Sequence, residues 1–362
     1  MPRFLASALL LVLGVGDYAG EEARPLLGPG APILTRPVPL DPANPARRTV
    51  GALTFLGGWS LSSPDRAFGS VSAMMMTTTA KGYRFTMLSD SGGVMIFDMD
   101  GAGVTANIRF LDLPAGPHGG FSKGARDSEA MAVDPASGRI WVAFENRNLI
   151  WRYAPGFARG EQKAWPPAMR AWPQASGPEA MVRLRSGRFV VIAEAAPGPQ
   201  GADDALIFPG DPTTLGIRPL RFGYRRPAGW RVTDVAELPD GRLLVLHRRV
   251  RLAEMKVAWI EGAPRLVRGI DSLIRVIDLK GVKDGGVVDG VDVAHLAWPM
   301  TADNFEAMAI SEEKGRTILW IASDHNFAFY QRTLLMKFAL GALPTDATPA
   351  RSTARMTPAN GR

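Results

Sequence analysis

The chain repeats one short pattern of polar and apolar positions three times. A Glu-Ala-Met core with apolar neighbours occurs in Asp-Ser-Glu-Ala-Met-Ala-Val at 127–133, Gly-Pro-Glu-Ala-Met-Val-Arg at 177–183 and Asn-Phe-Glu-Ala-Met-Ala-Ile at 304–310. Each copy is followed by a turn rich in glycine or charge and then by a second β-rich run, at 139–144, 188–193 and 317–322. Repetition at a period of tens of residues indicates a repeat architecture, and units built only of strands are typical of propeller blades.

Two weaker units extend this pattern. A hairpin is predicted from 71–76 and 83–88, and a degenerate copy runs through 232–238 to a return strand at 243–246. A sixth unit is expected from the segment around 50–55 and one neighbouring strand. Helical periodicity is nearly absent. The sequence therefore predicts an all-β propeller of four-stranded blades, with six blades preferred over five or seven. Pairing of the N- and C-terminal strands would close the ring and remove exposed edges.

The ends of the chain differ from this domain, which we place at 49–341. The apolar run at 4–15 follows Arg3 and has the length of a signal-peptide core, so 1–20 is interpreted as a signal peptide, with an apolar N-terminal strand as the alternative. Residues 21–48 are a Pro-rich extended lead-in, and 342–362 a disordered tail. No second apolar run could span a membrane, so we expect a periplasmic or secreted monomer that is soluble after signal removal.

Composition excludes several kinds of chemistry. The chain has no cysteine, which rules out disulfides, thiolate nucleophiles and sulfur-ligated zinc or iron–sulfur sites. Its net charge of +7 comes with dispersed arginines and no nucleic-acid-binding motif, so no nucleic-acid partner is expected. No P-loop, dinucleotide fingerprint, His-Glu-x-x-His site or Gly-x-Ser-x-Gly elbow occurs.

Polar residues recur at the two positions of each unit that a hairpin brings together. In an antiparallel pair the start of the first strand lies beside the end of the second. The pairs expected on this basis are Ser72 with Asp90, Glu129 with Glu145, Glu179 with Glu194, Asp234 with His247, and Glu306 with Asp324. Because the first strand of each blade lines the central channel, these side chains should gather at one mouth of the ring.

A cluster of carboxylates near the axis favours a bound cation. Like charges raise one another's pKa unless a cation neutralises them, and oxygen ligands without sulfur favour Ca²⁺. We therefore interpret Glu129, Glu179 and Glu306 as metal ligands, with Asp234 as the member from the fourth copy. The alternative is that each carboxylate accepts backbone N–H groups of the neighbouring blade.

The second position of each pair suggests acid–base and anion-binding groups. Glu145, His247 and Asp324 are candidate catalytic residues, and the alternatives are solvated or turn-stabilising carboxylates and a structural histidine. Arg147, Arg248 and Arg249 are candidates to bind a phosphate or carboxylate group, or else they are solvated strand ends.

The ordered motifs Ser-Asp-Ser-Gly at 89–92, Asp-Ser-Glu-Ala-Met-Ala-Val, Phe-Glu-Asn-Arg at 144–147, Gly-Pro-Glu-Ala-Met, and Asn-Phe-Glu-Ala-Met-Ala-Ile with Ser-Asp-His-Asn at 323–326 resemble the phytase-like domain family. Its members, often described as "esterase-like activity of phytase" proteins, are mostly exported bacterial proteins. The resemblance runs from about 53 to 340. It implies a β-propeller, and the family's name refers to propeller phytases whose carboxylates hold Ca²⁺ ions that bind phosphate and activate water.

Carried over by position, the resemblance implies metal ligands at Asp127, Glu129, Glu179 and Glu306, and phosphate contacts from the three arginines. The chain departs from a full acidic ring, since the fourth copy has Asp234 and the first has Ser72. The leading hypothesis is an exported Ca²⁺-assisted hydrolase of phosphoesters acting on a small anionic or ester substrate. The alternatives are a carboxylic-ester or lactone hydrolase, and a non-enzymatic propeller that binds a ligand or a protein.

Overall fold

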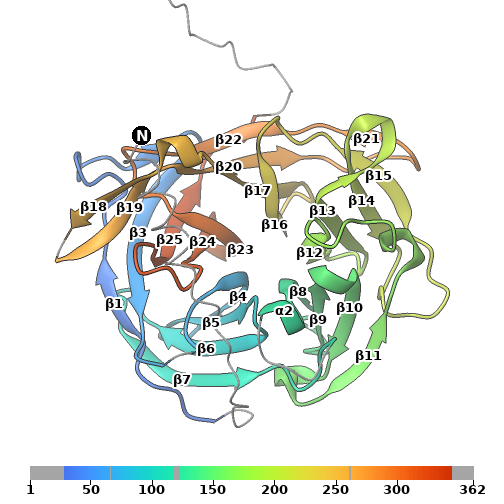
Figure 1. The fold of residues 1–362 in the computed structure, drawn as a ribbon, viewed down its shortest axis with the longest axis horizontal. Helices are drawn as coiled ribbons and strands as arrows, with labels where there is room; N and C mark the ends of the chain where they lie inside the picture. Colours follow the sequence, from blue (N-terminus) through green and yellow to red (C-terminus); the bar gives the residue numbers. More distant parts are fainter. Residues whose placement is uncertain (1–27, 66, 118–122, 261, 345–362) are drawn as a thin grey trace, which may run out of the picture.

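The computed structural model describes residues 28–65, 67–117, 123–260 and 262–344. These residues form a ring of antiparallel sheets around a central axis, as Figure 1 shows. The β-propeller predicted from the repeats is confirmed. The predicted signal peptide and most of the predicted tail lie outside the described residues. Within those residues, no helix is long and apolar enough to cross a membrane.

The ring has five blades, each with its innermost strand nearest the axis (Figure 1). The first three, written from the inside outward, are β4 (Val71–Thr79), β5 (Gly82–Ser89), β6 (Gly93–Met99) and β7 (Thr105–Asp112); β8 (Ser128–Val133), β9 (Ile140–Phe144), β10 (Leu149–Tyr153) and β11 (Gly160–Ala164); and β12 (Pro178–Arg183), β13 (Phe189–Pro197), β14 (Asp203–Phe208) and β15 (Leu220–Tyr224), beside which β21 (Val287–Val288) lies in parallel.

The fourth blade consists of β16 (Arg231–Glu237), β17 (Leu243–Val250), β20 (Ile270–Ile277) and β22 (Val291–Leu296). The fifth consists of β23 (Asn304–Glu313), β24 (Arg316–Asp324), β25 (Thr333–Leu340) and β3 (Leu53–Ser62), with β1 (Leu34–Pro37) and β2 (Thr49–Val50) paired to β3. A separate hairpin, β18 (Lys256–Ile260) and β19 (Ala263–Arg268), projects between β17 and β20. The described helices are short: α2 (Lys123–Arg126) and the 3₁₀ turns Glu145–Arg147, Pro155–Phe157, Pro167–Met169, Pro199–Gly201 and Leu252–Glu254.

The number of blades corrects the prediction of six. The segment around 50–55, expected to form part of a sixth blade, lies at the end of β2 and the start of β3, and β3 pairs antiparallel with β25 along its length, from Leu53 opposite Leu340 to Leu61 opposite Thr333. It therefore supplies the fourth strand of the last recognisable unit. The predicted closure of the ring by N- and C-terminal strands is present, and this closure uses the strands that a sixth blade would need.

Apolar side chains fill the space between neighbouring blades. Alternation along a strand sends one set of side chains to each face of a sheet, so each blade offers apolar side chains to both neighbours. Trp320 of β24 stacks on Trp59 at 6.2 Å and meets Phe85 of the first blade edge-on at 5.1 Å, measured between ring centroids. Burial of each such side chain contributes on the order of 1.5–3 kcal/mol. The first contact packs two strands of the fifth blade together, and the second joins the fifth blade to the first.

Candidate functional site

Each of the five inner strands carries a β-bulge at the same place. In β8, Ser128 pairs with Phe144 and Ala130 with Ala143, so Glu129 is the extra residue, and the other four blades repeat this register shift. A bulge re-aims the side chain of the extra residue. The residues at this position are Ser72, Glu129, Glu179, Thr233 and Glu306.

A second ring of equivalent residues lies at the end of the second strand of each blade. Backbone hydrogen bonds show this equivalence. The N–H groups of Asp90, Glu145 and Glu194 each donate to the carbonyl oxygen of the residue two positions before the bulged residue of the same blade. In the other two blades, Arg248 pairs with Arg231 and Asp324 pairs with Asn304. The members of this ring are Asp90, Glu145, Glu194, Arg248 and Asp324. Four of the five predicted pairs are thus brought together.

The fourth blade corrects the predicted register by one residue. Val232 pairs with His247 and Asp234 with Leu246, so the bulged residue is Thr233 and the residue of the second ring is Arg248. Asp234 points instead to the blade boundary, where its carboxylate accepts the N–H of Val235 at 2.7 Å and that of Met308 at 2.6 Å. Burial raises its pKa well above the ordinary value. Asp234 therefore accepts a backbone N–H group of the next blade, which is the role named as the alternative to metal binding.

His247 is also placed away from the mouth. Its side chain is fully buried, with Nε2 2.8 Å from the hydroxyl of Tyr224 and Nδ1 3.1 Å from the carbonyl oxygen of Leu273. The carbonyl can only accept, so Nδ1–H donates to it and Nε2 accepts from the tyrosine. Burial lowers the pKa of His247 to about 3. A neutral imidazole with both nitrogens engaged inside the core gives no support to the predicted general acid–base role.

Eight carboxylates and three cationic side chains of the described residues form one network at the mouth, which we call the mouth cluster. The carboxylates are Asp90, Asp127, Glu129, Glu145, Glu179, Glu194, Glu306 and Asp324, and the cations are Lys123, Arg231 and Arg248. All eight carboxylate residues except Glu145 are buried. The excess of negative charge favours a further cation.

On one side of this cluster, Lys123 approaches three carboxylates. Its Nζ lies 3.0 Å from Asp90, 3.7 Å from Glu129 and 3.9 Å from Asp127. Burial alone would lower the pKa of Lys123, but these carboxylates outweigh it and raise the pKa. Lys123 belongs to the short helix α2 between two blades and not to the repeat, so the repeat pattern could not reveal it. The available signal was its position four residues before Asp127.

Asp127, Glu129 and Glu145 form the closest group of carboxylates. One oxygen from each lies within 4.8 Å of the others. Burial raises the pKa of Glu145 to about 8, with further contributions from Asp127 and Glu194, and Oε1 of Glu145 accepts the N–H of Gly177 at 3.1 Å. Burial likewise raises the pKa of Glu129 well above its ordinary value, against the opposing effect of Lys123.

Arginines neutralise the other side. Arg248 forms ion pairs with Glu306 and, at 3.2 Å, with Glu194, and Arg231 forms a second pair with Glu194. Arg248 thus lies in the predicted mouth, but as a partner of carboxylates. Glu179 lies between the two sides: burial, Glu194 and Glu145 raise its pKa, and Arg248 opposes them.

The remaining predicted residues divide between the mouth and its surroundings. Asp324 is buried in the mouth, where burial, Glu306 and Asp90 raise its pKa well above the ordinary value, and its Oδ1 accepts the N–H of Asn326 at 2.7 Å. Arg147 is exposed. Arg249 pairs with Asp271 at 2.8 Å and lies 4.4 Å from the ring centroid of Trp230, so it is engaged outside the mouth cluster.

The group of Asp127, Glu129 and Glu145 fits a hard divalent cation. Ca²⁺ takes oxygen ligands at about 2.3–2.6 Å, so oxygens on opposite sides of one ion are about 5 Å apart. The three carboxylate oxygens lie within 4.8 Å of one another, which is compatible with this separation. The donors are all carboxylate oxygens, and the chain has no cysteine that would favour a softer metal. Glu179, Glu306 and Asp324 supply further carboxylates nearby.

Comparison with known proteins identifies the family. Residues 66–327 match the family described as "Phytase-like: Esterase-like activity of phytase". The match spans most of the chain, which therefore belongs to this family. No curated protein sequence matches the chain.

Two solved structures are similar to the chain at low identity. A chain of the crystal structure of the nidogen/laminin complex has 8% identity and a TM-score of 0.38, with 79% of this chain and 97% of that chain covered. The WD40 domain of Neurospora crassa Pan2 has 9% identity and a TM-score of 0.38, with 82% and 98% covered. Neither similarity bears on function.

Proposed function

We propose that this member of the phytase-like family is a hydrolase of phosphoesters that works with a bound divalent cation, Ca²⁺ by its ligand chemistry. The observation that carries the proposal is the group of Asp127, Glu129 and Glu145, whose oxygens lie within 4.8 Å of one another in a buried mouth with eight carboxylates and three cations. Family membership supports hydrolysis of an ester bond.

Different residues of the mouth are assigned different roles according to their positions. Asp127, Glu129 and Glu145 would hold the ion, which supplies charge neutralisation for the substrate and a water of lowered pKa. Glu145 is thus a candidate ligand rather than the free acid or base that the sequence suggested. Asp324 remains the candidate acid or base, because it is buried in the mouth and pairs with no cation at hydrogen-bond distance among the described residues.

Arg248 is the candidate group for binding the substrate anion. Its guanidinium faces the same mouth and now pairs with Glu194 and Glu306, so an incoming phosphate would compete with these carboxylates for it. Arg231, which shares Glu194, would retain that carboxylate when Arg248 turns to the substrate. We also propose export, because the apolar run at 4–15 has the length of a signal-peptide core. A Ca²⁺ site is compatible with that location, since extracellular proteins commonly bind Ca²⁺ with Kd values of about 10⁻⁴–10⁻³ M.

The test is phosphate release from inositol hexakisphosphate with added Ca²⁺ and with a chelator. The proposal expects release that requires Ca²⁺ and that falls at least about 100-fold in Glu129→Gln. Glu312→Gln is the matched control, because Glu312 is an exposed residue at the far end of the strand that carries Glu306. Full activity of Glu129→Gln, or release that ignores the chelator, would contradict the proposal.

The family description favours one other substrate class, the carboxylic esters. The same mouth would then polarise a carbonyl group, so p-nitrophenyl esters and lactones belong in the same assay. Hydrolysis of these with no phosphate release would replace the phosphoester by a carboxylic ester. Binding of Ca²⁺ with hydrolysis of neither class would leave the third hypothesis, a binding propeller in which the ion is structural.

A further inference from the structure

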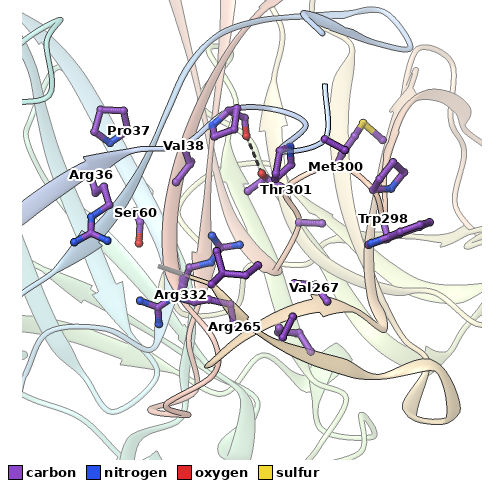
Figure 2. A pocket seen from close by; sticks show the side chains of 18 of the residues that line it. Arg36, Pro37, Val38, Ser60, Arg265, Val267, Trp298, Met300, Thr301 and Arg332 are labelled. Carbon is purple, nitrogen blue, oxygen red and sulfur yellow. Dashed lines mark hydrogen bonds between the residues drawn. The ribbon is translucent and has the colours of Figure 1, made fainter. Parts of the chain in front are cut away.

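A cavity of about 930 Å³ lies at the outer edge of the ring, and we call it the side pocket. It is bounded by β1, by the β18–β19 hairpin and by the segment 298–302, and its lining includes Arg36, Lys256, Arg265, Trp298, Met300 and Arg332 (Figure 2). No residue of the mouth cluster lines it. Pockets for small molecules typically have volumes of about 300–1,000 Å³, so the side pocket has room for one such ligand.

Hydrogen bonds to backbone carbonyl groups fix its walls. The N–H of Thr301 donates to the carbonyl oxygen of Leu40 at 2.7 Å, and the Thr301 hydroxyl donates to that of Pro39 at 2.7 Å, the bond drawn in Figure 2. The projecting hairpin is fixed at its other end, where the N–H of Leu266 donates to the carbonyl oxygen of Tyr330 at 2.7 Å. A pocket formed in advance binds a ligand without the cost of ordering its walls.

The charge of the side pocket has one sign. Its lining residues include the cations Arg36, Lys256, Arg265 and Arg332, of which Arg332 pairs with the buried Asp303 at 4.0 Å, and none of its described lining residues is an aspartate or glutamate. Among the described residues, neither Lys256 nor Arg265 has a carboxylate partner. In Figure 2, Arg265 and Arg332 lie between Arg36 on one side and Trp298 and Met300 on the other. Guanidinium groups bind carboxylate and phosphate groups through paired hydrogen bonds, so the pocket complements an anion.

The remaining lining is largely apolar. Trp298 is 56% exposed and Ile260 38% exposed, although both are large apolar side chains, and Val38, Val267 and Met300 lie beside them in the lining. The guanidinium of Arg268 lies 5.7 Å from the ring centroid of Trp298, a cation–π contact that holds the indole in place. An inorganic anion would leave this surface exposed, whereas an apolar chain would cover it.

We propose that the side pocket binds a small amphiphilic anion, in which a carboxylate or phosphate head is joined to an apolar chain. The head binds Arg265 and Lys256, and the chain packs on Trp298 and Ile260. This site is separate from the proposed active site, because it shares no residue with the mouth cluster and needs no divalent cation.

Isothermal titration calorimetry with decyl phosphate and decanoate, kept below their micelle concentrations and with chelator present, tests the proposal. Decanol and inorganic phosphate are the probes that lack the head or the chain. We expect both amphiphiles to bind one site per chain at least tenfold more tightly than either control. Arg265→Glu and Trp298→Ala should each weaken decyl phosphate binding at least tenfold, and Arg170→Glu, an exposed arginine outside the lining, should leave it unchanged.

Three results would overturn the proposal. The first is equal binding of decanol, which would show that the cations take no part. The second is unchanged affinity in a folded Lys256→Glu/Arg265→Glu variant, which would place the ligand elsewhere. The third is cosedimentation with vesicles of an anionic phospholipid without binding of monomeric decyl phosphate, which would indicate a membrane-facing surface. Glu129→Gln distinguishes the two sites. If this variant loses hydrolysis but keeps amphiphile binding, the loss is due to the mouth alone and leaves the side-pocket proposal intact.

Discussion

Lys123 acts as an internal counterion of the mouth, and its removal tests the electrostatics of the whole cluster. The variant Lys123→Met keeps the length of the side chain and removes the ammonium group that lies 3.0–3.9 Å from Asp90, Glu129 and Asp127. A pair of unit charges at 4 Å is worth about 4 kcal/mol at an effective dielectric constant near 20, and much less where water reaches it. Because 51% of the Lys123 side chain is exposed, we discount the three contacts together to about 1–3 kcal/mol.

Without Ca²⁺, Lys123→Met should therefore lower the free energy of unfolding by about 1–3 kcal/mol, because three buried carboxylates lose their cation. Bound Ca²⁺ should offset part or all of this loss, since Lys123⁺ repels an ion held by Asp127 and Glu129. Affinity for Ca²⁺ should rise about tenfold, which corresponds to about 1.4 kcal/mol.

The assay is thermal unfolding of both proteins in chelator and across a Ca²⁺ titration, with Kd from calorimetry. Lys314→Met, at an exposed turn between β23 and β24, controls for loss of a lysine as such. If Ca²⁺ stabilises Lys123→Met no more than the parent protein, Lys123 and the ion do not compete and the proposed ion position is wrong.

Three further variants separate the roles of the remaining residues. Glu129→Gln should abolish stabilisation by Ca²⁺. In chelator its unfolding temperature should be unchanged or higher, because the substitution removes one of several like charges. Thermal denaturation scans with Ca²⁺ and with chelator test both expectations. Asp234→Ala should cost about 2–3 kcal/mol through the backbone N–H groups of Val235 and Met308 that it leaves unpaired, with the Ca²⁺ affinity unchanged by calorimetry. His247→Phe should cost about 1–3 kcal/mol, but activity per folded molecule should persist. Because the folded-state pKa of His247 is about 3 and the unfolded value about 6.5, its stabilisation is present above pH 6.5 and is lost as pH falls toward 3; denaturant titrations between these values should show a flatter pH dependence in the variant.

The repeat made most of the fold predictable, because the Glu-Ala-Met pattern marks the inner strand of three blades. The number of blades could not be read in this way. Repetition identifies units, but β3 shares no motif with the strand it joins, and only the pairing of Leu53 with Leu340 shows that it completes the fifth blade. The same closure accounts for Leu34–Pro37, predicted as part of an extended lead-in, which forms the edge strand β1.

The errors in the candidate site have a different cause, the β-bulge. A bulge shifts the pairing register by one residue, and in a strand one residue exchanges the two faces. In three blades the Glu-Ala-Met motif itself marked the bulged residue. The fourth blade lacks this motif, so matching the blades by their carboxylates selected Asp234 and His247. Asp234 is one residue from the bulged position, and His247 is one residue from the second-ring position. The shift replaced Thr233, the bulged residue, and Arg248, a member of the mouth cluster, with two residues buried at blade boundaries.

The corrected register explains the polarity of the mouth. Four blades contribute carboxylates to the second ring, and the fourth blade contributes Arg248 there and Arg231 beside it. The mouth is therefore divided: Asp127, Glu129 and Glu145 remain in excess over Lys123 on one side, whereas Glu194 and Glu306 are paired with arginine on the other. A ring of identical acidic blades could bind only cations. Arg248 in one blade places a guanidinium group in the same mouth, and under the proposed function a phosphate-bearing substrate would be held between a divalent cation and this arginine.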